Sequence, residues 1–239
     1  MFNREELVKR YRDFNIRKRI DLEKYGIKSF DKQTFNGLNN LIELNLRLNR
    51  LQLIPKEAFD GLFHLSALDL SANELEKIES SAFNNLIALK SIDLFHNQLK
   101  NIDKNTFSDL KNLVRIDLSN NQLKQIDKDA FKGLTNLSQI DLSKNELQLI
   151  DEFTFRDLPN LKVIDLSHNK ILKIHKDIFR GLFNLTHIYL NNNELHSNKL
   201  ELFLEKNVQF ISHRHDRDEN NIDSIFRPAK VRNIKLKIC

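Results

Sequence analysis

The sequence has few of the residues that build disulfides, metal sites and tight turns. Its 239 residues include one cysteine, no tryptophan, three prolines and five glycines. Because Cys239 is the only cysteine, an intramolecular disulfide and a Cys-x-x-Cys metal pair are both excluded. The sequence contains no phosphate-binding loop, serine elbow or pair of catalytic carboxylates, so it predicts a protein that is not an enzyme and that needs no cofactor.

Long apolar runs are also missing. No stretch contains the run of about 20 apolar residues that a membrane-spanning helix needs, so no transmembrane segment is predicted. The N-terminus, which begins Met1-Phe2-Asn3-Arg4, is too charged to supply the apolar part of a secretory signal. Taken literally, these features predict a cytoplasmic protein if the chain is complete.

The formal charge of +5 is unevenly distributed. Residues 1–32 carry ten Lys and Arg against six Asp and Glu, and residues 227–239 carry five Lys and Arg with no acid. Residues 33–226 keep 23 basic and 27 acidic residues, a charge of −4. Since a nucleic-acid-binding protein is expected to carry its basic residues along one folded face, this distribution argues against a nucleic-acid partner.

A period of 24 residues runs through the chain without an insertion. Each unit reads L-x-x-L-x-L-x-x-N-x-L-x-x-I-x-x-x-x-F-x-x-L-x-x. The alternating apolar residues, such as Leu44 and Leu46, are typical of a strand with one buried face. One strand per unit, always followed by a return segment, predicts a parallel sheet, and the return has room only for extended or single-turn segments. We therefore expect a curved arc with the sheet on its concave side.

Two columns of the repeat are predicted to be structural. The amide of each asparagine can donate to and accept from backbone groups that the turn after the strand leaves unpaired. These residues are Asn49, Asn73, Asn97, Asn121, Asn145, Asn169 and Asn193. An aromatic column is expected to stack toward the back of the core, and it comprises Phe35, Phe59, Phe83, Phe107, Phe131, Phe155, Phe179 and Phe203.

The repeat resembles the leucine-rich-repeat family, specifically its 24-residue typical class. The resemblance implies an α/β fold, a right-handed leucine-rich-repeat solenoid with a parallel sheet on the concave face and short helical or extended segments on the convex face. About eight repeats occupy residues 20–206, the first of them degenerate because Tyr25 stands where asparagine is expected. Extracellular members of this class usually carry disulfide-bonded caps, which this sequence lacks. The resemblance therefore implies an intracellular protein or, as the phenylalanine-bearing repeat favours, a fragment of a receptor ectodomain.

Both ends of the array are predicted to be capped. Residues 1–19 are expected to form an N-terminal helical cap, with a short amphipathic helix that starts at Asn3, Glu6 in the capping-box position and Leu7, Tyr11 and Phe14 on one face. Residues 207–239 are expected to form a C-terminal cap, which begins with a strand at 208–211, and a basic tail.

Side chains between and beside the buried strand residues are expected to face the concave side, exposed and free to vary. The aspartate column, one such set about 4.8 Å apart from strand to strand, consists of Asp69, Asp93, Asp117, Asp141 and Asp165. It is either an acidic strip that binds a basic ligand, or a common filler, meaning that aspartate is simply the residue this repeat usually carries at that position. Departures from the filler are the stronger candidates, because aromatic and arginine side chains are enriched in binding hot spots. They are Arg47, Leu48, Phe95, His96, Arg115, Val163, His168, His187 and Tyr189.

Two other patterns are given little functional weight. His213, His215, Asp216 and Asp218 are metal-binding residue types, but they lie in a polar stretch without a supporting framework, so no metal site is predicted. The segments starting at Asn136 and Asn184 satisfy the glycosylation sequon, although Asn-Leu is itself part of the repeat.

The sequence thus predicts a scaffold for protein–protein interaction that binds a macromolecular partner on its concave face, with a basic protein favoured by the aspartates. One alternative is an intracellular enzyme regulator or inhibitor that wraps around a basic partner. A second is an adaptor tethered to an anionic membrane surface through the tail at residues 227–239.

Overall fold

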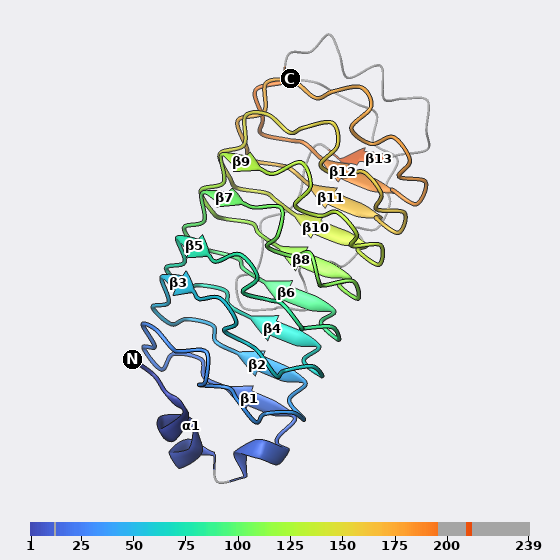
Figure 1. The fold of residues 1–239 in the computed structure, drawn as a ribbon. Helices are drawn as coiled ribbons and strands as arrows, with labels where there is room; N and C mark the ends of the chain where they lie inside the picture. The colour runs from blue at the N-terminus through green and yellow to red at the C-terminus, as the bar shows by residue number, and fades with distance from the viewer. Residues whose placement is uncertain (12, 196–208, 212–239) are drawn as a thin grey trace.

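The structure of this protein is a computed structural model, which describes residues 1–11, 13–195 and 209–211. The chain coils as a solenoid whose strands stack along one axis (Figure 1). Its main sheet has nine parallel strands in the order β1-β2-β4-β6-β8-β10-β11-β12-β13. They are β1 (Arg19–Asp21), β2 (Glu43–Asn45), β4 (Ala67–Asp69), β6 (Ser91–Asp93), β8 (Arg115–Asp117), β10 (Gln139–Asp141), β11 (Val163–Asp165), β12 (His187–Tyr189) and β13 (Gln209–Ile211).

The strands from β1 to β12 pair in a register equal to the repeat length. Ile116 of β8 is paired with Ile140 of β10, and Asp117 is paired with Asp141. A register of 24 residues brings equivalent positions of successive repeats side by side, so each column of the sequence becomes a row across the sheet.

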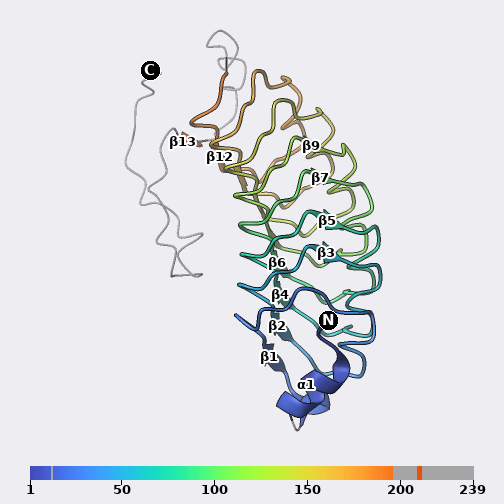
Figure 2. The same cartoon turned by 90° about the vertical axis from the view of Figure 1, so that its left-hand side faces the viewer.

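The return segments lie on the opposite side of the coil (Figure 2). There β3 (Leu53–Ile54) pairs with β5 (Lys77–Ile78), and β7 (Asn101–Ile102) pairs with β9 (Gln125–Ile126). Between residues 19 and 195 the chain contains turns and these short strands in place of helices. The predicted extended or single-turn return is therefore confirmed, because 24 residues hold a strand and two turns but no long helix.

The spacing of the phenylalanine column explains why the arc curves toward the sheet. Ring centroids are 5.8 Å apart between Phe35 and Phe59 and 6.4 Å apart between Phe155 and Phe179, and the rings are stacked. Strands in a sheet lie only about 4.8 Å apart. Since the backs of the coils are more widely spaced than the fronts, the sheet occupies the concave side. The leucine-rich-repeat solenoid fold predicted from the sequence is confirmed.

The asparagine of each repeat bonds to the backbone of two coils. The Oδ1 atom of Asn121 accepts a hydrogen bond from the backbone N–H of Leu99 at 3.1 Å. Its Nδ2 donates to the carbonyl oxygens of Leu94 and Leu118 at 2.9 and 3.1 Å. The same pattern occurs at all seven asparagines, so each amide fastens the turn of its own strand to the preceding repeat.

A helix covers the N-terminal end. The α1 helix (Arg4–Arg10) begins after Asn3, whose side chain accepts from the N–H of Glu6, and its Leu7 is fully buried. The helix is shorter than predicted, because Phe14 belongs to a separate 3-10 helix, η1 (Phe14–Ile16). Tyr11 ends the first helix with a non-helical backbone.

The hydroxyl of Tyr11 occupies the outer edge of β1. It donates to the carbonyl oxygen of Asp21 and accepts from the N–H of the same residue at 3.2 Å. Desolvation by partial burial raises the pKa of Tyr11. Because an open sheet edge presents unpaired backbone groups, this contact satisfies part of the edge.

At the other end, β13 pairs with β12 in parallel, so the strand predicted at 208–211 is confirmed within one residue. The other expectations for residues 207–239, including the basic tail and the histidine-rich stretch at 213–218, lie outside the described residues. None of the helices in the described part of the chain has the length and apolar character needed to cross a membrane.

Candidate functional site

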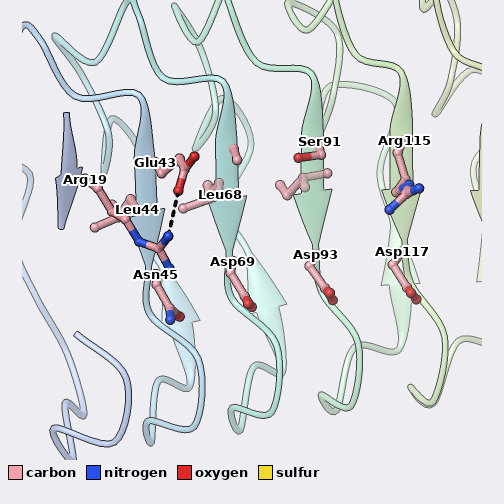
Figure 3. Close-up of a pocket in the computed structure, with 12 residues that line it drawn as sticks. Arg19, Glu43, Leu44, Asn45, Leu68, Asp69, Ser91, Asp93, Arg115 and Asp117 are labelled. Carbon is pink, nitrogen blue, oxygen red and sulfur yellow. Dashed lines mark ion pairs between the residues drawn. The ribbon is translucent and has the colours of Figure 1, made fainter. Parts of the chain in front are cut away.

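A hollow of about 230 Å³ lies on the concave face between β1 and β8 (Figure 3). Two small side chains, Ala67 and Ser91, lie side by side in the strand column that precedes the aspartates. Larger charged residues flank them in the same column, with Arg19 and Glu43 on one side and Arg115 on the other. The lining residues are Arg19, Glu43, Leu44, Asn45, Ala67, Leu68, Asp69, Ser91, Ile92, Asp93, Arg115 and Asp117.

The charged residues at the rim are held by neighbours in adjacent strands. Arg19 forms an ion pair with Glu43 at 3.4 Å, and the two side chains are 65% and 49% exposed. The Nε atom of Arg115 donates to the Oε1 atom of Gln139 at 3.0 Å. Both signs of charge therefore surround the hollow, and the parallel register determines where each one lies.

The aspartate column has a local structural role. The Oδ1 atom of Asp117 accepts from the backbone N–H and the hydroxyl of Ser119. The same bond to the N–H two residues later occurs at each of the other four aspartates, and Asn45 makes it with Arg47. An Asp or Asn side chain that bonds to the backbone two residues on stabilises a turn. This favours the filler interpretation of the column.

The expectation that the whole aspartate column is exposed is wrong. Asp117, Asp141 and Asp165 are 2%, 0% and 0% exposed. Asp69 and Asp93 are only partly buried. The difference follows the size of the residues two positions earlier: Ala67 and Ser91 are small, whereas Arg115, Gln139 and Val163 are larger side chains on the same face of the strand.

Several other predicted residues lie outside the hollow and contact one another or their neighbours. Arg47 donates to the Ser71 hydroxyl at 3.3 Å, and the rings of His187 and Tyr189 stack at 6.4 Å. The Phe95 ring packs against the His96 ring at 5.7 Å. Of the fourteen candidates predicted on the concave face, the hollow brings together Asp69, Asp93, Arg115 and Asp117 and leaves the rest outside.

His96 and His168 lie in the turns after the strands rather than on the sheet face. Their φ angles are 55° and 54°, in the left-handed region, and the equivalent position of the next repeat is asparagine in both cases. The His168 ring contacts the amide of Asn192 at 2.8 Å, and His96 contacts Asn120 in the same way. Histidine and asparagine tolerate this backbone conformation better than most residues, which gives both histidines a local structural role.

Sequence reasoning missed Arg19 and Glu43. Both belong to the first strand position, which runs through Arg115, Val163 and His187, but only the later members of that column were recognised as candidates. Arg19 precedes the first asparagine-bearing repeat, so the degenerate unit concealed its place in the column.

Comparison with known families agrees with this architecture. The leucine rich repeat family model matches residues 18–75, 63–123, 87–147, 111–171, 135–195 and 159–205. These matches overlap and cover most of the sequence, so the chain belongs to the leucine-rich-repeat family. No curated protein matches the sequence.

Three solved structures illustrate the likeness. Toll, in its complex with Spatzle from Drosophila, is 25% identical with a TM-score of 0.69, over 74% of this chain and 25% of Toll. TLR13, in complex with ssRNA13, is 30% identical with a TM-score of 0.58, over 73% of this chain and 29% of TLR13. Internalin C2 of Listeria monocytogenes is 25% identical with a TM-score of 0.63, over 81% of this chain and 80% of the internalin. This chain thus spans between a quarter and a third of the two receptor chains.

Proposed function

We propose that this chain is a protein-interaction module that binds a macromolecular partner on the concave face of its sheet. The observation that carries the proposal is the hollow between β1 and β8, where two small side chains are surrounded by charged ones. A concave surface with a few convergent polar groups is where recognition sites are usually found.

The charges at the hollow favour a partner that presents both signs. Glu43, Asp69 and Asp93 can attract a basic side chain of the partner, and Arg115 can bind a carboxylate. The acidic part of the site is thereby reassigned from Asp117 and Asp141, which are buried, to residues at the N-terminal half of the sheet. Electrostatic complementarity of this kind contributes mainly to association rate and specificity.

The relatives supply precedents for two partner classes, protein for Toll and RNA for TLR13. Glu43, Asp69 and Asp93 at the hollow repel the phosphates of a nucleic acid, which normally bind Lys and Arg. These three acids therefore favour a protein partner on this face.

A photo-crosslinking residue tests the location. A benzoylphenylalanine at position 91 lies in the hollow, and the same residue at position 104 lies in a return segment. We expect the partner, captured from the native source, to crosslink to the first chain and not to the second. Crosslinking from position 104 alone would place the interface on the convex side and contradict the proposal.

Charge reversal at Arg115 gives a second test. We expect Arg115→Glu to weaken capture of the crosslinked partner, whereas Lys104→Glu on the return segment leaves it unchanged. Equal capture by the two variants, with the same melting temperature, would contradict binding at the hollow.

The alternative functions differ in what they require of the chain. Tethering to an anionic membrane requires the basic residues at 227–239. If the chain is tethered in this way, deletion of that segment abolishes its binding to anionic vesicles. If the concave face alone carries the function, the same deletion leaves partner capture intact. An enzyme regulator is recognised by a change in the activity of the captured partner when this chain is added.

A further inference from the structure

Three metal-binding side chains from two successive repeats meet in the return segments, away from the concave hollow. One ligand atom from each of Glu152, His175 and Asp177 lies within 4.8 Å of the others. The Nδ1 atom of His175 is 2.9 Å from the Oε2 atom of Glu152. The backbone N–H of Asp177 lies 3.3 Å from the same Nδ1, and a metal ion bound to that nitrogen would replace this contact.

This cluster departs from the repeat template. The positions equivalent to Glu152 in other repeats hold lysine or serine, namely Lys56, Ser80, Lys104, Lys128 and Lys176. The positions equivalent to His175 hold Pro55, Glu79, Asp103, Asp127 and Asp151. At four earlier junctions, from Lys56 and Glu79 to Lys128 and Asp151, a basic or neutral residue therefore precedes an acidic residue of the next repeat. At this junction alone the order is an acid followed by histidine.

One earlier junction has a hydrogen bond between the equivalent residues. The backbone N–H of Lys56 donates to the Oε2 atom of Glu79, one repeat later, at 2.9 Å. At the equivalent junction of Glu152 and His175, a carboxylate oxygen and an imidazole nitrogen face each other instead. The regular packing of the repeats thus explains why the two positions lie close together. It does not explain why three side chains that can bind a metal ion are found there.

We propose that Glu152, His175 and Asp177 form a zinc-binding site that joins these two repeats. One imidazole nitrogen and two carboxylate oxygens are ligands that Zn²⁺ accepts, at about 2.0–2.2 Å each. Two ligand atoms of a tetrahedral zinc ion lie about 3.3 Å apart, close to the 2.9 Å between Nδ1 and Oε2. Calcium and magnesium are disfavoured, because both prefer a set of oxygen ligands.

The exposure of the cluster determines the kind of zinc site. His175 is exposed, and Glu152 and Asp177 are partly buried, so the ion can enter from solvent and water completes the coordination. Three protein ligands and an open position differ from the closed four-ligand arrangement of structural zinc sites. Bound zinc would link two coils of the solenoid and stabilise the folded chain by mass action.

Zinc titration of the full chain tests the proposal. All samples carry His213→Ala and His215→Ala, which remove the other closely spaced histidines of the sequence. Calorimetry with Zn²⁺ is expected to show one site per chain, and Co²⁺ is expected to give visible absorption bands that Zn²⁺ abolishes. The matched control is His168→Ala, which removes an exposed histidine from the turn after β11 in the same repeat and is expected to leave the zinc affinity unchanged.

Variants of the three ligands decide the outcome. His175→Ala is expected to weaken zinc binding by about tenfold or more and to abolish the rise in melting temperature on adding zinc. Glu152→Gln and Asp177→Asn, which keep the side-chain size, are expected to weaken it also, so the test survives if the histidine variant folds poorly. Undiminished binding in all three variants, or no binding by the parent, would overturn the proposal.

Discussion

The side-chain amide of Asn136 donates a 2.9 Å hydrogen bond to the backbone carbonyl oxygen of Lys111, which lies 25 residues earlier in the preceding repeat. This contact belongs to a second asparagine column, on the segment that leads from the phenylalanine to the strand. Asn112, Asn160 and Asn184 are bonded in the same way to the repeat before them, and Asn40 is bonded to Asn15 of η1 in the N-terminal cap. Both glycosylation sequons are therefore part of a structural column.

The sequon and the hydrogen bond can be separated by substitution. Asn136→Ala removes both, whereas Ser138→Ala removes only the sequon. For protein made in bacteria, we expect Asn136→Ala to lower the free energy of unfolding by about 0.5–1.5 kcal/mol, the usual net value of one hydrogen bond, and Ser138→Ala to leave it nearly unchanged. Urea unfolding measures both. A loss confined to Ser138→Ala would contradict a structural role for this amide.

The buried asparagines should matter more than those of the second column. Asn121 is 8% exposed, and Asn121→Ala leaves a backbone N–H and two carbonyl oxygens without their side-chain partner. We expect a loss of about 1–3 kcal/mol in the free energy of unfolding. Asn193→Ala is the matched comparison, because Asn193 makes the same bonds while only partly buried, and it should cost less. Equal losses would show that burial does not set the cost.

The phenylalanine column predicts a larger effect. Phe107 is fully buried and stacks on Phe83 and Phe131 with centroids 6.1 and 6.2 Å apart. Phe107→Ala is expected to destabilise the protein by about 3–5 kcal/mol, because it removes buried apolar surface and leaves a cavity. Phe63→Ala serves as the control, since that ring is 46% exposed and should contribute far less. Chemical denaturation of the wild type and both variants measures the two losses in the free energy of unfolding.

The N-terminal cap should respond to alkaline pH. Burial raises the pKa of Tyr11 in the folded chain, so the neutral phenol is the form that the fold favours. The stability it contributes is present below the unfolded pKa of about 10 and is lost as the pH rises through the raised folded value. We expect the wild type to melt above Tyr11→Phe at neutral pH and this difference to shrink at alkaline pH. A difference that grows with pH would contradict the assignment.

Much of the fold could be predicted because the 24-residue period is repeated many times. The buried strand residues, the asparagine turns and the phenylalanine column each follow from a position in the repeat, and the register of Ile116 with Ile140 follows from its length. The N-terminal helix was predicted to start at Asn3, but its end was missed. Tyr11 leaves the helix to bond with Asp21, a contact that is not visible in the helical pattern.

The candidate site was less predictable. A column of aspartates appears uniform in the sequence, yet Asp69 is partly exposed while Asp141 is buried. The difference comes from Ala67 and Gln139, which precede them by two residues on the same strand face. Exposure of a side chain depends on the size of its neighbours across and along the sheet, and that is set only once the strands are assembled.

The repeat alone determined that the chain forms a parallel solenoid, because every unit must bury the same leucines and can do so only against its neighbours. The tertiary structure alone decided which side chains surround the concave hollow and which three residues of successive coils meet at Glu152. Both sets of contacts join residues of neighbouring repeats, and their geometry depends on the spacing and curvature of the stacked coils rather than on any local pattern.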